Sequence, residues 1–138
     1  MRFVKLIKGV FLLCIFLACA YKVKSSGCGG NNPCGSGSNY VDISNWCSQY
    51  DGWSMECCSC IASQESGGDA NACNLNTNGT YDIGLWQIND SNWNSCSGGN
   101  APCDPNDNLQ CAIDVFNWGG QTWKFWSTCS TCGCCDSS

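Results

Sequence analysis

The most informative part of the chain is the segment Tyr81-Asp82-Ile83-Gly84-Leu85-Trp86-Gln87-Ile88-Asn89, together with Gln64-Glu65-Ser66 before it. Glu65 and Asp82 lie seventeen positions apart. The chain contains no histidine, so it has neither a Ser-His nor a Cys-His pair for nucleophilic catalysis. If the chain is an enzyme, carboxylates are its natural acid and base, and Glu65 and Asp82 are the candidate catalytic residues.

The residues before Glu65 predict a helix. Ser54 is a suitable N-cap residue. The apolar residues that follow it at helical spacing are Met55, Cys58, Ile61 and Ala62. Because Gly67-Gly68 ends this helix, Glu65 is expected at or near its C-terminal end.

The residues around Asp82 predict an antiparallel hairpin. Asn78-Gly79 is a dipeptide typical of tight hairpin turns, and strand-forming residues flank it. The second strand is expected over residues 81–85, with Asp82 on it. The remaining expected elements are a helix over 43–50 capped by Asp42, a polar loop over 90–103, a helix from Pro105 to Gly119-Gly120 capped by Asp104, and a short aromatic helix over 122–126.

The N-terminus predicts an export signal over residues 1–20. Basic residues come first, an almost purely apolar run follows from Val10 to Leu17, and Ala18-Cys19-Ala20 fits a small-residue cleavage site. The apolar run is too short to span a bilayer comfortably. Residues 21–40 then form a Cys- and Gly-rich arm, and residues 41–138 form one catalytic domain that ends in a Cys-rich tail.

The charge balance excludes several classes of partner. All 11 acidic residues follow position 20, where Lys22, Lys24 and Lys124 are the only basic residues, so the net charge of this part is −8. Such a chain is not suited to non-specific binding of nucleic acid or of anionic membranes. We expect it to be secreted or to work in the lumen of an acidic digestive compartment such as a lysosome or phagosome.

The cysteines predict a domain cross-linked by disulfides. Of 16 cysteines, Cys14 and Cys19 leave with the signal, and the 14 that remain allow seven bridges. Val, Ile and Leu together number only eleven after position 20, so the core needs cross-links. Cys57-Cys58-Cys60 and the cysteines of 129–135 have spacings seen in zinc sites, but export and the lack of histidine favour disulfides. No metal and no cofactor are expected.

The two candidate carboxyl groups are expected in unlike surroundings. Glu65 ends an apolar helix with tryptophans nearby, so desolvation would raise its pKa. Asp82 is expected beside asparagines on a polar sheet, where it would stay ionised. One protonated and one ionised carboxyl group are what hydrolysis of a glycosidic bond requires.

The same residues resemble c-type (animal) lysozymes. The resemblance is carried by Gly52-Trp53-Ser54-Met55, Cys60, Glu65-Ser66 and residues 74–89, from Asn74-Leu75-Asn76 to Gln87-Ile88-Asn89. It runs without a gap over residues 52–89 and more loosely to Cys129. The resemblance implies an α+β lysozyme-like fold, with several short helices against a small antiparallel hairpin sheet and the active cleft between them.

The resemblance also implies residue roles. Glu65 would be the general acid and Asp82 the nucleophile or ion stabiliser of a retaining cleavage, of which lysozyme is itself the standard example. By the same resemblance, Gln87 and Asn89 would lie along the cleft, and Trp93 would stack on a sugar at its rim. Trp123 would pack against the acid, and Trp126 would be its neighbour in the core. Cys60 would form a disulfide with Cys129.

Four features depart from the family. Residues 21–40 contain no counterpart of its N-terminal helix, the cysteines exceed its usual eight, and the chain is acidic where members are often basic. The segment between Cys96 and Cys111 is also shortened, which would reshape one wall of the cleft.

These observations favour a monomeric glycosidase that acts on β-1,4 bonds of peptidoglycan, with chitin-like oligosaccharides as poorer substrates. Two alternatives stay open. One is a non-catalytic glycan-binding module, and the other is a lytic transglycosylase that needs Glu65 but not Asp82.

Overall fold

The computed structural model describes residues 27–138. The expected export signal and residues 21–26 of the arm lie outside this range. The helices are η1 Gly29–Asn31, α1 Ile43–Cys47, α2 Met55–Ser66, η2 Asp90–Asn92, α3 Trp93–Cys96, α4 Pro105–Trp118 and α5 Cys129–Cys132. The strands are β1 Cys73–Leu75, β2 Tyr81–Ile83 and β3 Ile88–Asn89. The fold is therefore α+β, as expected, and none of the helices described is long and apolar enough to cross a membrane.

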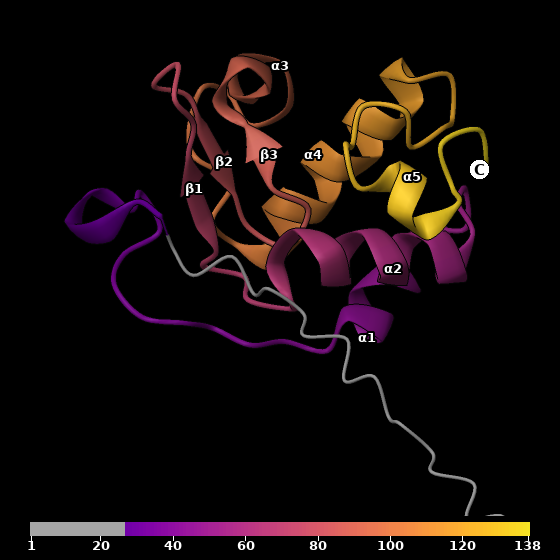
Figure 1. The fold of residues 1–138 in the computed structure, drawn as a ribbon, viewed down its shortest axis with the longest axis horizontal. Helices are drawn as coiled ribbons and strands as arrows, with labels where there is room; N and C mark the ends of the chain where they lie inside the picture. Colours follow the sequence, from indigo (N-terminus) through magenta and orange to yellow (C-terminus); the bar gives the residue numbers. More distant parts are fainter. Residues whose placement is uncertain (1–26) are drawn as a thin grey trace, which may run out of the picture.

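The elements form two sides joined by one helix. In Figure 1 the sheet lies on one side, α4 and α5 lie on the other, and α2 runs along the lower edge of both. The arm of residues 27–40 passes outside the sheet before it reaches α1. Glu65, in the last turn of α2, thus lies where the two sides meet.

The helix that carries Glu65 has the ends that the sequence predicts. The side chain of Ser54 accepts a hydrogen bond from the backbone N–H of Cys57, which satisfies one of the free donors of the first turn. Gly67 takes up the left-handed conformation at φ 64° and ends the helix. These two local signals fix the position of Glu65 along the helix axis.

The sheet has three antiparallel strands in the order β1-β2-β3. β1 and β2 are joined by the predicted turn, in which Gly79 has φ 85°. Asp82 pairs with Asn74 of β1 and with Asn89 of β3. Because directly opposed residues point to the same face of a sheet, this register brings two amide side chains to Asp82.

Three expectations for local structure were wrong. β3 adds a strand that the hairpin prediction lacked, and the expected loop over 90–103 contains η2 and α3. Residues 122–126 form turns rather than a helix. In that segment Trp123 and Trp126 are buried while Lys124 and Phe125 are exposed, so core packing of the two indoles outweighs local helix propensity.

Seven disulfides cross-link the fourteen cysteines of residues 27–138, which confirms the bridge count. The pairs are Cys28–Cys73, Cys34–Cys103, Cys47–Cys58, Cys57–Cys134, Cys60–Cys132, Cys96–Cys111 and Cys129–Cys135. The pairing of Cys60 with Cys129 was therefore wrong. Cys132 of α5 forms the disulfide with Cys60 of α2, and Cys129 pairs with Cys135 within the C-terminal tail.

The core is built mainly from aromatic rings and half-cystines. Trp53 lies at its centre, with ring centroids 5.1 Å from Trp123, 5.7 Å from Phe116 and 6.0 Å from Trp86. Large rings of this kind bury more apolar area per residue than aliphatic side chains do. Such a core suits a chain with so few Val, Ile and Leu residues.

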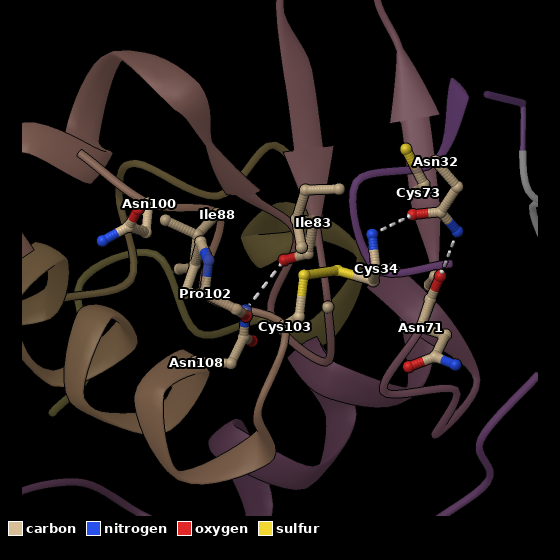
Figure 2. Close-up of a disulfide and its surroundings, with 12 residues drawn as sticks. Asn32, Cys34, Asn71, Cys73, Ile83, Ile88, Asn100, Pro102, Cys103 and Asn108 are labelled. Carbon is tan, nitrogen blue, oxygen red and sulfur yellow. Dashed lines mark hydrogen bonds between the residues drawn. A yellow bond between two sulfur atoms is a disulfide. The ribbon is translucent and has the colours of Figure 1, made fainter. Parts of the chain in front are cut away.

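Asn108 of α4 joins the helical side to the sheet. Its side chain is 1% exposed, donates to the carbonyl oxygens of Ile83 at 2.9 Å and Pro102 at 3.0 Å, and accepts from the N–H of Trp86 at 3.1 Å. Figure 2 shows the bond to Ile83 beside the Cys34–Cys103 disulfide. Gly84, at φ 79°, leaves room for this amide, because a Cβ there would overlap it.

We predict that Asn108→Ala lowers the free energy of unfolding by about 3 kcal/mol, because it leaves three buried backbone groups without their partner. Urea or guanidinium unfolding of the oxidised protein measures the change. Asn106→Ala, an exposed asparagine on the same helix, is the matched control and should change stability by about 0.5 kcal/mol or less. Equal effects of the two substitutions would contradict this role for Asn108.

Candidate active site

A pocket of about 570 Å³ opens between the sheet and the helical side. This volume lies within the range of roughly 300–1,000 Å³ that is usual for small-molecule sites. Its lining comes from α2, β2, β3, α4 and the connecting segments: Glu65, Asn76, Asp82, Gln87, Ile88, Asn89, Ser91, Asn92, Val115, Trp118, Phe125, Trp126 and Ser127. The structure thus brings Glu65 and Asp82 together in one cavity.

Glu65 is largely withdrawn from solvent. Its side chain is 7% exposed although it lines the pocket. The hydroxyl group of Thr128 donates a hydrogen bond of 2.6 Å to Oε1 of this carboxyl group. Burial disfavours the charged form of a carboxyl group, whereas a donated hydrogen bond favours it, so this environment is set by two opposing effects.

Asp82 lies in a polar environment of a different kind. Its Oδ1 accepts from the amide of Asn89 at 2.8 Å, and its Oδ2 accepts from the amides of Asn76 at 2.9 Å and Asn74 at 3.4 Å. An ionised carboxylate accepts on both oxygens and donates from neither, which fits this set of three donors. The sheet register described above is the reason that these amides surround Asp82.

The amides themselves are held in place by further contacts. Asn76 and Asn89 both donate to the hydroxyl oxygen of Thr80, at 3.1 and 3.2 Å. The side-chain oxygen of Asn89 accepts from both the backbone N–H and the hydroxyl group of Ser91. Asn89 therefore lines the pocket as predicted, but its amide is directed at Asp82.

Gln87 also lies in the pocket wall, where the sequence places it. It is 8% exposed and has a positive φ of 49°, and its amide donates to the carbonyl oxygens of Ala72 and Gly84 at 3.1 Å. These bonds rigidify the turn between β2 and β3. The side chain thus forms part of the wall and supports it at the same time.

The three tryptophans named from the sequence lie at different depths in the structure. Trp123, expected against the acid, is fully buried in the core and is not part of the pocket lining. Trp126 lines the pocket with Glu65 instead, and its indole N–H donates to the carbonyl oxygen of Trp86 at 2.8 Å. Trp93, expected at the rim, packs half-buried against the core, with its N–H bound to the carbonyl oxygen of Ile88, and does not line this pocket.

Several residues at the site were not singled out from the sequence, among them Trp118, Phe125 and Thr128. Trp118 and Phe125 line the pocket while 48% and 59% exposed. The signal for Trp118 was an aromatic residue at a helix end, directly before the pair Gly119-Gly120. Thr128 gave no such signal, because it contacts a residue 63 positions away.

The site provides carboxyl, amide, hydroxyl and aromatic groups. Within residues 27–138, no group of three or more histidine, cysteine, aspartate or glutamate side chains could hold a metal ion. The clusters around Cys57 and Cys132 are joined to each other by disulfides. The chemistry of the described site is therefore that of a buried carboxyl group facing a pocket shared with a hydrogen-bonded carboxylate.

Residues 49–128 match the family described as Lysozyme like domain. The match spans more than half of the chain and includes every residue of the pocket lining. The chain belongs to this family. Its fold is consistent with glycosidase or transglycosylase activity on a glycan related to peptidoglycan. Comparison with curated proteins gives no match.

Proposed function

We propose that this protein is a glycoside hydrolase of the c-type lysozyme kind. Its substrate is the β-1,4 bond between N-acetylmuramic acid and N-acetylglucosamine in peptidoglycan, and chitin-like oligosaccharides are poorer substrates. The observation that carries the proposal is that one pocket holds a carboxyl group withdrawn from solvent, Glu65, and a carboxylate bound by three amides, Asp82.

In the first step Glu65 donates its proton to the oxygen of the glycosidic bond, and the leaving sugar departs with that oxygen. The carboxylate of Asp82 attacks or stabilises the anomeric carbon as positive charge develops there. In the second step Glu65, now ionised, removes a proton from water, which attacks the same carbon and releases Asp82. Retention of configuration follows from these two displacements.

The surroundings of each carboxyl group suit its role. Exclusion of water around Glu65 favours a neutral acid that has a proton to give. The amides of Asn74, Asn76 and Asn89 hold Asp82 in one orientation, so it requires little reorganisation as the cation forms. Trp118 and Phe125 supply exposed rings on the helical wall, against which the apolar face of a sugar would stack.

A lytic transglycosylase is the second candidate. The observation that favours it is that the family match is to the lysozyme-like domain in general, and a transglycosylase needs one acid at the position of Glu65. In that reaction the 6-hydroxyl group of the muramic acid attacks the anomeric carbon, and an anhydro-sugar is released. A non-catalytic glycan-binding module would use the same pocket without any turnover.

We further propose that the protein is exported and acts as a monomer in an acidic compartment or outside the cell. Seven disulfides in residues 27–138 support an oxidising destination. The excess of acidic residues would oppose approach to anionic cell walls at neutral pH and low salt. Partial protonation of carboxylates in an acidic lumen weakens this repulsion.

The first test is clearing of a suspension of Gram-positive cell walls by the oxidised protein. Glu65→Gln should lower the rate of clearing by about a hundred- to ten-thousandfold, because an amide has no acidic proton to transfer to the leaving oxygen. Binding to the cell walls should persist. Glu56→Gln, an exposed change at the start of the same helix, is the matched control and should clear as the wild type does. Binding without clearing by all three proteins would favour the binding module.

The second test separates the hydrolase from the transglycosylase. Asp82→Ala should lower the rate at least about a hundredfold if Asp82 is the nucleophile or ion stabiliser. Wild-type products should carry reducing ends, which mass spectrometry of the released sugars distinguishes from anhydro-sugars. Asp107→Ala, at an exposed position on α4, controls for the loss of a negative charge. Near wild-type activity of Asp82→Ala, with anhydro products, would favour the transglycosylase.

The third test is the dependence of rate on pH. Activity requires Glu65 protonated and Asp82 ionised, so the profile should be bell-shaped with an optimum at acidic pH. It falls on the acid side as Asp82 gains a proton and on the alkaline side as Glu65 loses one. Initial rates between about pH 4 and about pH 7 measure both limbs. A rate that rises steadily toward alkaline pH would contradict the assignment.

A further inference from the structure

The hydrogen bond between Thr128 and Glu65 joins the C-terminal part of the chain to the pocket. The Thr128 hydroxyl group lies 2.6 Å from Oε1 of Glu65, across 63 residues of sequence. Thr128 is half-buried and is the residue from which α5 begins. The donor–acceptor distance is at the short end of the range for O–H···O hydrogen bonds, and this contact constrains the orientation of the Glu65 side chain.

The tail that carries Thr128 is tied covalently to the helix that carries Glu65. Cys60, five residues before Glu65 on α2, is bonded to Cys132 of α5. Cys57, one turn earlier, is bonded to Cys134 just after α5. These two cross-links tie α5 to α2, and Thr128 lies directly before α5.

The residues before and after Thr128 in the chain are also held in place. Trp126, two residues earlier, is 5% exposed, and its indole N–H is bound to the carbonyl oxygen of Trp86. Cys129, the next residue, is buried and bonded to Cys135. Thr128 thus lies between two buried, fixed residues, and its hydroxyl group has little freedom to leave the carboxyl group.

We propose that Thr128 is a positioning residue for the acid Glu65 and that the C-terminal disulfides serve to hold it there. The proposal rests on the proposed function of Glu65. By donating to Oε1, Thr128 fixes one oxygen as an acceptor and sets the rotation of the carboxyl group, so that the proton is presented to the substrate in one geometry. Proton transfer depends on such geometry, since small displacements of a catalytic group cost large factors in rate.

Several other ionisable groups lie on the elements around Glu65. They are Asp82 on β2, Asp114 on α4, Lys124 in the segment after α4, Asp136 after α5 and Glu56 at the start of α2 itself. Of these, Asp82 alone lines the same pocket. Lys124 lies over the ring of Phe125, with its amine 5.4 Å from the ring centroid. Substitution of Thr128 leaves all of these groups in place.

The test compares Thr128→Val and Thr128→Ser with the wild type in the oxidised, full-length secreted protein. Thr128→Val keeps the shape and removes the donor, so kcat should fall about tenfold with KM little changed. The alkaline limb of the pH profile should move to higher pH, because the ionised form of Glu65 loses a donor. Thr128→Ser, which keeps the hydroxyl group, should restore most of kcat and the wild-type profile.

Thr131→Val is the matched control, since Thr131 is an exposed threonine on α5 itself, and it should leave kcat and the pH profile unchanged. Thermal unfolding checks that each variant is folded, and Thr128→Ala provides the same comparison if the valine variant does not fold. A wild-type kcat and profile in the folded variants without the hydroxyl group would overturn the proposal. Failure of the wild type itself to clear cell walls would instead overturn the proposed function, so the two failures are distinguishable.

Discussion

Seven disulfides hold the domain together within residues 27–138. Eleven Val, Ile and Leu residues after position 20 leave little aliphatic material for a core, and the interior consists mainly of tryptophans and half-cystines. Disulfides lower the conformational entropy of the unfolded chain and thereby stabilise a domain whose apolar burial is small. Two of them join α2 to the tail, and two others join the arm of residues 27–40 to β1 and to the residues before α4.

The two carboxyl groups of the site owe their different surroundings to two different kinds of secondary structure. Glu65 comes from the end of a helix whose apolar face is buried, so its side chain is withdrawn from water. Asp82 comes from the central strand of a small polar sheet, where each neighbouring strand presents an asparagine at the opposed position. Asn108 holds the sheet and α4 in register, which keeps the walls of the pocket at a fixed separation.

The C-terminal end of the lysozyme-like fold is held by covalent cross-links. The tail after Trp126 is closed on itself by one disulfide and fastened to α2 by two more. This arrangement delivers a hydroxyl group to the buried acid from a segment far away in sequence. The extra cysteines therefore bear on the site as well as on stability, because they fix the element that contacts Glu65.

The sequence by itself determined the elements that carry the site. Ser54 and Gly67 set the ends of α2, Asn78-Gly79 set the hairpin, and the spacing of Glu65 and Asp82 indicated the pair that the structure brings into one pocket. The partner of Cys60, the burial of Trp123, the place of Trp126 in the pocket lining and the contact of Thr128 emerge only when the chain is folded. The physical reason is that caps, turns and periodicity are local, whereas disulfide pairing and indole packing depend on which distant segments meet in a dense core.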